Sequence, residues 1–212
     1  MILNYFQESD KIDTAIIGLH GWTGTEYSMV PVAKSMKVPN AKWYIPRAPY
    51  NASSGKGYTW FSGSPETGWK SKKTFNLMDK IFNQIINDGF FPNKIILLGF
   101  SMGASLAIRY GLTLDVILKG IIPIAGMVRD TEELLDSSSI ESKQTPILMI
   151  HGKKDSVVDY HNSINLAKIL KNNGYTSHVE IVESGHIISI PTSRLVRSFI
   201  KTGSIEKMNL AL

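Results

Sequence analysis

The chain has 212 residues, no cysteine and a formal net charge of +5. The lack of cysteine excludes disulfide bonds, thiolate metal sites and a cysteine nucleophile. No apolar run approaches the roughly 20 residues of a transmembrane helix, and the scattered basic residues do not indicate nucleic-acid binding. The N-terminus lacks the basic start and apolar stretch of a signal peptide. We therefore expect a cytoplasmic protein without stable membrane insertion, formed by a single domain over residues 1–212.

Buried strands and amphipathic helices are predicted to alternate along the chain. Short apolar runs, typical of strands buried on both faces, lie at residues 12–19, 43–45, 95–98, 121–125, 146–150 and 178–182. Between and after them, the sequence predicts helices at about residues 26–37, 72–88, 102–114, 131–135, 160–173 and 191–201. This alternation predicts an α/β fold with a mostly parallel sheet and helices on both faces.

The segment 47–70 interrupts this alternation. It is rich in Gly, Ser and Pro, and it contains Tyr58, Trp60 and Phe61. An irregular loop of this length inside a domain is usually functional or disordered. Its aromatic content favours packing over a pocket. The chain leaves no room for a separate lid domain.

The motif Gly-Phe-Ser-Met-Gly at residues 99–103 stands between a predicted strand and a predicted helix. In this context a G-x-S-x-G motif forms a tight strand-to-helix turn that presents the serine hydroxyl at the top of a parallel sheet. Glycine is needed two residues to either side because the backbones there pack too closely for a Cβ atom. Ser101 is therefore the candidate nucleophile.

A serine hydroxyl needs a base to take its proton, and histidine suits this task because its pKa lies near neutral pH. The histidine in turn needs a carboxylate that fixes its tautomer. Ser101, Asp155 and His186 each follow a different predicted strand, and this is the chain order of an α/β-hydrolase triad. Ligands gather at the carboxyl ends of parallel strands. The triad chemistry calls for no cofactor and no metal ion.

Four other histidines and one other aspartate compete for these roles. His20 and His151 stand at strand ends before glycine, where a ring often holds loop backbone by hydrogen bonds. His161 begins a helix and His178 begins a strand, which are ordinary surface settings. Asp159 precedes a predicted helix and is better explained as its N-cap.

Two backbone N–H groups are needed to stabilise the oxyanion of a tetrahedral intermediate. In this fold one belongs to the residue after the nucleophile, which is Met102 here. We expect the second at Trp22, in the glycine-rich turn after the strand that ends at residue 19. Because the donors are backbone groups, both side chains are free to shape the pocket.

Six short segments together resemble the phospholipase/carboxylesterase family of small α/β-hydrolases, which includes the acyl-protein thioesterases. They are residues 19–21, 46–49, 60–61, 99–103, 151–155 and 184–186. The resemblance spans about residues 15–199. It implies a serine esterase without a lid domain that acts on short- to medium-chain acyl esters, sometimes on thioesters, and that often forms a homodimer. It carries the same triad and oxyanion roles to the residues named above. Many members have Gln where this chain has Met102 and Leu where it has Trp22.

The leading hypothesis is a carboxylesterase whose partner is a small-molecule acyl ester. Trp22, Trp60, Phe61 and Met127 are predicted to bind the acyl or alcohol part of the substrate. The same triad could serve an acyl thioesterase, a lysophospholipase or an amidase, and a lactone or carbon–carbon hydrolase is a further alternative. From another class, the chain could be a non-catalytic ligand-binding protein on a hydrolase scaffold.

Overall fold

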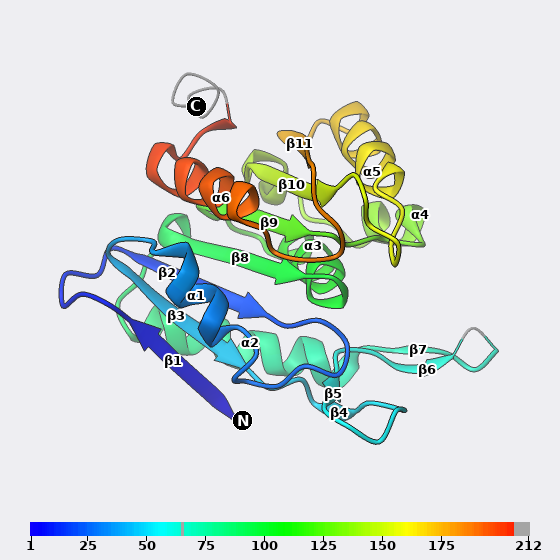
Figure 1. Ribbon diagram of the computed structural model, residues 1–212, viewed down its shortest axis with the longest axis horizontal. Coiled ribbons are helices and arrows are strands. Elements are labelled where there is room, and N and C mark those ends of the chain that lie inside the picture. The colour runs from blue at the N-terminus through cyan, green and yellow to red at the C-terminus, as the bar shows by residue number, and fades with distance from the viewer. Residues whose placement is uncertain (65, 206–212) are drawn as a thin grey trace.

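The computed structural model describes residues 1–64 and 66–205, and a seven-stranded sheet lies at its centre (Figure 1). The strand order is β1-β3-β2-β8-β9-β10-β11, and only the β1–β3 pair is antiparallel. The strand bounds are β1 Leu3–Gln7, β2 Thr14–Leu19, β3 Ala41–Pro46, β8 Ile95–Phe100, β9 Gly120–Ile124, β10 Ile147–Gly152 and β11 Ser177–Val182. The predicted mostly parallel sheet is confirmed.

Helices cover both faces of the sheet, as predicted. Their bounds are α1 Val30–Met36, α2 Lys72–Asn87, α3 Met102–Thr113, α4 Thr131–Asp136, α5 His161–Asn172 and α6 Ile190–Thr202. Short 3₁₀ turns lie at Pro92–Lys94 and Glu141–Gln144. Figure 1 shows α1 and α6 in front of the sheet and α2 and α3 behind it. In the described part of the chain, no helix is long and apolar enough to cross a membrane.

The central strands have continuous apolar runs because successive side chains point to opposite faces, and both faces are buried. On β2, Ile17 belongs to the hydrophobic cluster that includes residues of α2, α3 and α5, whereas the neighbouring Ile16 belongs to the cluster that includes residues of α1 and α6. On β8, Leu97 and Leu98 divide in the same way. The two hydrophobic clusters therefore fix the sheet from both sides and hold the ends of its strands in place.

The helix predicted at residues 26–37 begins later than expected. Residues 25–29 form hydrogen-bonded turns, and α1 starts at Val30, with a proline in its first turn. Glu26 is buried in this turn region and accepts a hydrogen bond of 2.6 Å from Nε of Arg47. This ion pair links the turn after β2 to the chain that leaves β3.

The segment 47–70 contains two short antiparallel ribbons rather than an irregular loop. β4 (Tyr50–Asn51) pairs with β5 (Tyr58–Thr59), and β6 (Ser62–Ser64) pairs with β7 (Gly68–Lys70). The backbone N–H of Tyr58 also donates a hydrogen bond to the carbonyl oxygen of Gly24. Figure 1 shows both ribbons at the end of the molecule toward which the parallel strands point. They therefore border the edge of the sheet where Ser101 lies.

Candidate active site

Ser101 occupies a strained turn between β8 and α3. Its φ and ψ angles are 55° and −117°, a combination that non-glycine residues rarely adopt. Its backbone N–H donates a 2.8 Å hydrogen bond to the carbonyl oxygen of Ile124, and its own carbonyl accepts from Ala104. Such strain persists only where the surroundings hold it in place. The turn therefore fixes the position of the serine hydroxyl beyond the end of β8.

The two glycines of the motif allow the close approach that this turn requires. A Cβ atom at Gly99 would lie 2.1 Å from the carbonyl oxygen of Gly103. A Cβ atom at Gly103 would lie 2.3 Å from the carbonyl oxygen of Leu19, at the end of β2. Helix α3 therefore packs directly on the backbone of β2 and β8, which brings the turn after β2 next to Ser101.

Replacing Gly103 with alanine is expected to lower the free energy of unfolding by about 1 to 3 kcal/mol, because the new methyl group meets backbone that cannot move aside. Gly111→Ala on the same helix is the matched control, since its Cβ would meet the ends of the Ile121 and Leu97 side chains, which can rotate. Both variants share the same gain in helix propensity. Urea denaturation measures the two losses. Equal losses would show that backbone approach is not what requires glycine at position 103.

The three predicted triad residues lie within hydrogen-bond reach of one another. Nε2 of His186 is 3.0 Å from Oγ of Ser101, and Nδ1 of His186 is 2.7 Å from Oδ2 of Asp155. The rings of His186 and Phe100 lie 4.9 Å apart, so Phe100 supports one side of the imidazole. This geometry lets His186 take a proton from Ser101 while Asp155 holds its other nitrogen.

Asp155 is held as an ionised carboxylate by its surroundings. Its side chain is fully buried, and its Oδ1 accepts hydrogen bonds of 2.8 Å and 2.9 Å from the backbone N–H groups of Val157 and Val158. Burial alone would raise the pKa of Asp155, but these N–H groups and His186 outweigh burial and hold the pKa below its ordinary value. The carboxylate is thus fixed in both charge and direction.

The competing histidines and the competing aspartate have other partners. The buried ring of His20 contacts the Gly21 carbonyl at 2.7 Å and accepts a hydrogen bond from the backbone N–H of Ala48. Buried His151 contacts Ser163 Oγ and the carbonyl of Val158, and its Nε2 also lies 3.2 Å from Oδ2 of Asp155. In an exposed setting, Asp159 accepts from the backbone N–H of the first residue of α5.

His178 and His161 are also paired away from Ser101. His178 lies on β11 and its Nε2 is 2.7 Å from a carboxylate oxygen of Glu180. His161 is more than half exposed and its Nδ1 is 2.8 Å from Oδ1 of Asp159. Of the five histidines, His186 is the one whose ring has a hydrogen-bond contact with Ser101 in the described part of the chain.

Buried His20 is expected to make the protein less stable as the pH falls. Burial lowers the pKa of His20, although the Gly21 carbonyl and Glu26 act in the opposite direction. The unfolded state then binds more protons below about pH 6.5. The stability that the neutral His20 ring contributes is therefore fully present above that pH and is lost as the pH falls.

Replacing His20 with asparagine should reduce the slope of the unfolding free energy against pH, between about pH 7 and 5, by up to about 1.4 kcal/mol per pH unit. Urea titrations at several pH values measure this slope, and an unchanged slope contradicts the prediction.

The two predicted oxyanion donors lie on neighbouring turns. Met102 is the first residue of α3, and Trp22 stands in the turn in which the Gly24 N–H donates to the Gly21 carbonyl. Within residues 1–64 and 66–205, no acceptor pairs with the backbone N–H of Met102 or Trp22. A Cβ atom at Gly21 would lie 3.4 Å from Cβ of Ser101. Two unpaired N–H groups are thus available beside the serine.

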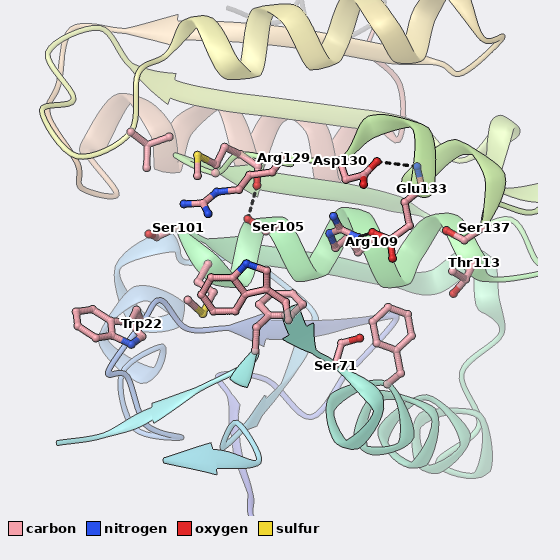
Figure 2. Close-up of a pocket in the computed structure, with 17 residues that line it drawn as sticks. Trp22, Ser71, Ser101, Ser105, Arg109, Thr113, Arg129, Asp130, Glu133 and Ser137 are labelled. Atoms are coloured by element: carbon pink, nitrogen blue, oxygen red, sulfur yellow. Dashed lines mark hydrogen bonds and ion pairs between the residues drawn. The ribbon is translucent and has the colours of Figure 1, made fainter. Parts of the chain in front are cut away.

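A cavity of about 700 Å³ extends from Ser101 along one side of α3 (Figure 2). Ser105, Arg109 and Thr113 line it at four-residue intervals, which places them on one face of the helix. Figure 2 shows this row running from Ser101 toward Thr113, with residues of α4 opposite. Three of the predicted pocket residues also line the cavity, namely Trp22, Phe61 and Met127.

The prediction that Trp60 contributes to the pocket is wrong. Its side chain is fully buried, and its indole N–H donates a 2.7 Å hydrogen bond to the carbonyl of His20. The ring also packs on the imidazole of His20 at a centroid distance of 4.7 Å. Trp60 therefore supports the turn after β2 from inside the core. The tryptophan that lines the cavity from this segment is Trp69, on β7.

Among the described residues, no group of three His, Asp or Glu side chains is placed to hold a metal ion. The chemistry that the geometry supports is carried by the serine, histidine and aspartate.

The chain is similar to known hydrolases over most of its length. The model of a family described as Phospholipase/Carboxylesterase matches residues 5–204. Carboxylesterase SOBER1 from Arabidopsis thaliana is 28% identical over 204 residues, which are 89% of this chain and 90% of that protein. Acyl-protein thioesterase 1 from Cryptococcus neoformans is 28% identical over 162 residues, which are 68% of this chain and 67% of that protein.

Solved structures show the same fold. The crystal structure of Arabidopsis thaliana SOBER1 has a TM-score of 0.80 at 26% identity, over 90% of this chain and 98% of that chain. The crystal structure of esterase PE8 has a TM-score of 0.83 at 24% identity, over 95% and 98% of the two chains, and supports the fold alone. No separate lid domain is found in the described residues. The chain therefore belongs to the phospholipase/carboxylesterase family, has an α/β-hydrolase fold and is a serine hydrolase.

Proposed function

We propose that this protein is a carboxylesterase that hydrolyses short- to medium-chain acyl esters, with Ser101, His186 and Asp155 as its catalytic triad. The observation that carries the proposal is the placement of His186 between the other two residues, with one ring nitrogen 3.0 Å from Ser101 Oγ and the other 2.7 Å from Asp155 Oδ2. A binding protein has no need of this proton path, which argues against a non-catalytic role.

In the proposed mechanism, Oγ of Ser101 attacks the ester carbonyl carbon while Nε2 of His186 accepts the serine proton. The negative charge that develops on the carbonyl oxygen is stabilised by the backbone N–H groups of Met102 and Trp22. His186 then gives the proton to the leaving alcohol, and the acyl group stays on Ser101. A water molecule, deprotonated by His186, attacks the carbonyl carbon of the acyl-enzyme. His186 then returns this proton to Oγ of Ser101 as the bond to the acyl group breaks and the acid leaves. Asp155 stabilises the imidazolium in both halves of the reaction.

The walls of the cavity support an acyl substrate of modest size. Phe61, Trp69, Phe75 and Met127 give part of it an apolar surface. Its volume of about 700 Å³ lies within the range of small-molecule sites. We therefore infer that the cavity holds a short or medium-length acyl chain, or the alcohol part of the ester.

Thioester hydrolysis is the second candidate, because a relative over two thirds of this chain is called an acyl-protein thioesterase. The acyl-enzyme chemistry is the same for esters and thioesters. The preference for one of them is a ratio of kcat/KM values, which depends on how tightly the site binds each transition state. A lysophospholipase activity would use the same triad.

A series of p-nitrophenyl esters from acetate to dodecanoate tests the proposal. Hydrolysis by the wild type, with an optimum at short or medium chain length, supports a carboxylesterase. A matched ester and thioester with the same acyl group then separate the two candidates by their values of kcat/KM. Failure to hydrolyse any ester or thioester contradicts the proposal.

The expected cytoplasmic location and homodimer formation stay predictions. Cell fractionation tests the first, and sedimentation equilibrium of the purified protein tests the second.

A further inference from the structure

Among the charged side chains that line the cavity in the described part of the chain, one has neither a hydrogen-bond partner nor an ion-pair partner. Four charged residues line it. Nη1 of Arg109 is 2.9 Å from Oε2 of Glu133, so these two form an ion pair. Asp130 Oδ1 accepts a hydrogen bond of 2.9 Å from the backbone N–H of Glu133 and caps α4. Within residues 1–64 and 66–205, Arg129 has no ion-pair or hydrogen-bond partner.

The position of Arg129 makes it part of the site. It stands in the loop between β9 and α4, and Figure 2 shows its guanidinium extending into the cavity, toward the Ser101 end in that view. Ser105 Oγ donates a 2.6 Å hydrogen bond to the carbonyl of Met127 and thereby ties this loop to α3. Ser105 is four residues after Ser101, which corresponds to roughly 6 Å along a helix axis. The loop is therefore anchored close to the serine.

Arg129 is an exposed residue, and the cavity that it lines also has apolar side chains in its walls. Phe61, Trp69 and Met127 make part of the lining of the same cavity apolar. A guanidinium presents a planar fork of N–H donors that matches a carboxylate, and it binds such groups with two parallel hydrogen bonds. An apolar surface with one unpaired cation suits a ligand that is apolar along most of its length and anionic at one point.

We propose that the preferred substrates are acyl esters that carry a carboxylate, and that Arg129 binds this carboxylate in the cavity. This inference rests on the proposed ester hydrolysis at Ser101 and adds the class of ester. The carboxylate can belong to the acyl part, as in a half-ester of a dicarboxylic acid, or to the alcohol part. The guanidinium is a specificity-determining group, and the bonds that form and break are those of the triad mechanism.

The test compares charged and neutral esters of similar length. In the acyl arm, monoethyl adipate is compared with ethyl hexanoate, and in the alcohol arm, 4-(hexanoyloxy)butanoate is compared with butyl hexanoate. The readout is the ratio of kcat/KM for the carboxylate ester to kcat/KM for its neutral partner, measured at constant pH by titration of released acid. This ratio cancels any general loss of activity in a variant.

Arg129→Gln should lower this ratio by roughly tenfold in at least one arm, which is the lower range for a hydrogen bond to a charged group. Arg129→Lys should have a ratio between those of Arg129→Gln and the wild type, because lysine keeps the positive charge but lacks the paired N–H donors of the guanidinium. Added salt should lower the wild-type ratio, because the contact is solvent-accessible. The arm that responds shows which part of the ester carries the carboxylate.

Arg194→Gln is the matched control. Arg194 is exposed on α6, does not line the cavity, and its substitution removes the same unit of charge. This variant should keep the wild-type ratio within about twofold.

An unchanged ratio in Arg129→Gln in both arms overturns the proposal. An equal fall of the ratio in Arg194→Gln also overturns it, because it would indicate an effect of net charge. If wild type hydrolyses ethyl hexanoate and Ser101→Ala does not, the proposed function stands even when this inference fails.

Discussion

Replacing Ser101 with alanine is expected to lower kcat for ester hydrolysis by roughly 10⁴- to 10⁶-fold. The variant keeps the Cβ atom and the turn but removes the oxygen that lies 3.0 Å from Nε2 of His186. No acyl-enzyme can then form, and the remaining rate comes from the oxyanion donors and from substrate binding. The measurement is p-nitrophenyl ester hydrolysis by wild type and variant at equal protein concentration.

Ser53→Ala is the matched control for this substitution. Ser53 is exposed on the turn between β4 and β5, and the same hydroxyl is removed there. Its kcat should match that of the wild type within about twofold. A Ser101→Ala variant that folds and keeps more than a tenth of the wild-type kcat would contradict the assignment of the nucleophile.

Replacing Asp155 with asparagine is expected to lower kcat by roughly 10³- to 10⁴-fold. The oxygen of the new side-chain amide can still accept hydrogen bonds from the backbone N–H groups of Val157 and Val158, as Oδ1 of Asp155 does. The amide nitrogen would then face Nδ1 of His186 and donate to it. This places the ring proton on Nε2, the atom that must accept the proton of Ser101. The variant would also lose the negative charge that stabilises the imidazolium.

Asp159→Asn provides the comparison for Asp155→Asn. It makes the same chemical change four residues later, at an exposed aspartate that accepts a hydrogen bond from the backbone N–H of His161, the first residue of α5. It should change the free energy of unfolding by less than about 1 kcal/mol, because the asparagine oxygen can accept the same hydrogen bond, and leave kcat close to the wild-type value. Steady-state kinetics and urea denaturation of both variants separate catalytic from structural effects. If Asp155→Asn loses less activity than tenfold while remaining folded, Asp155 does not serve as the triad acid.

The sequence predicted the central strands well and the first strand not at all. β2 and β8 are recognisable because both of their faces are buried, which requires continuous apolar runs. β1 (Leu3–Gln7) is an edge strand that mixes polar and half-buried residues, and it depends on pairing with β3 for its structure. The turns before α1 contain the buried Glu26, whose carboxylate pairs with Arg47, and local periodicity cannot show such a contact between distant segments.

The sequence predicted the arrangement of the triad better than the lining of the cavity. Ser101, Asp155 and His186 could be found because each follows a strand of one parallel sheet, so the fold itself brings them together. Trp60 was misplaced because its burial depends on a hydrogen bond to His20, which is 40 residues away in the chain. The row from Ser105 to Thr113 was missed, although four-residue spacing after the serine turn was a signal that could have indicated it.

Labelling by a serine-reactive phosphonate, with the modified residue identified by peptide mass spectrometry, is the decisive test of Ser101 as an activated nucleophile. We expect one phosphonyl group per chain, attached to Oγ of Ser101, with no label in Ser101→Ala and much slower labelling in Asp155→Asn. The probe reports activation of the hydroxyl by His186 and does not depend on knowing the natural substrate. Hydrolysis of esters by a protein whose Ser101 stays unlabelled, or a label found at another residue, would contradict the account.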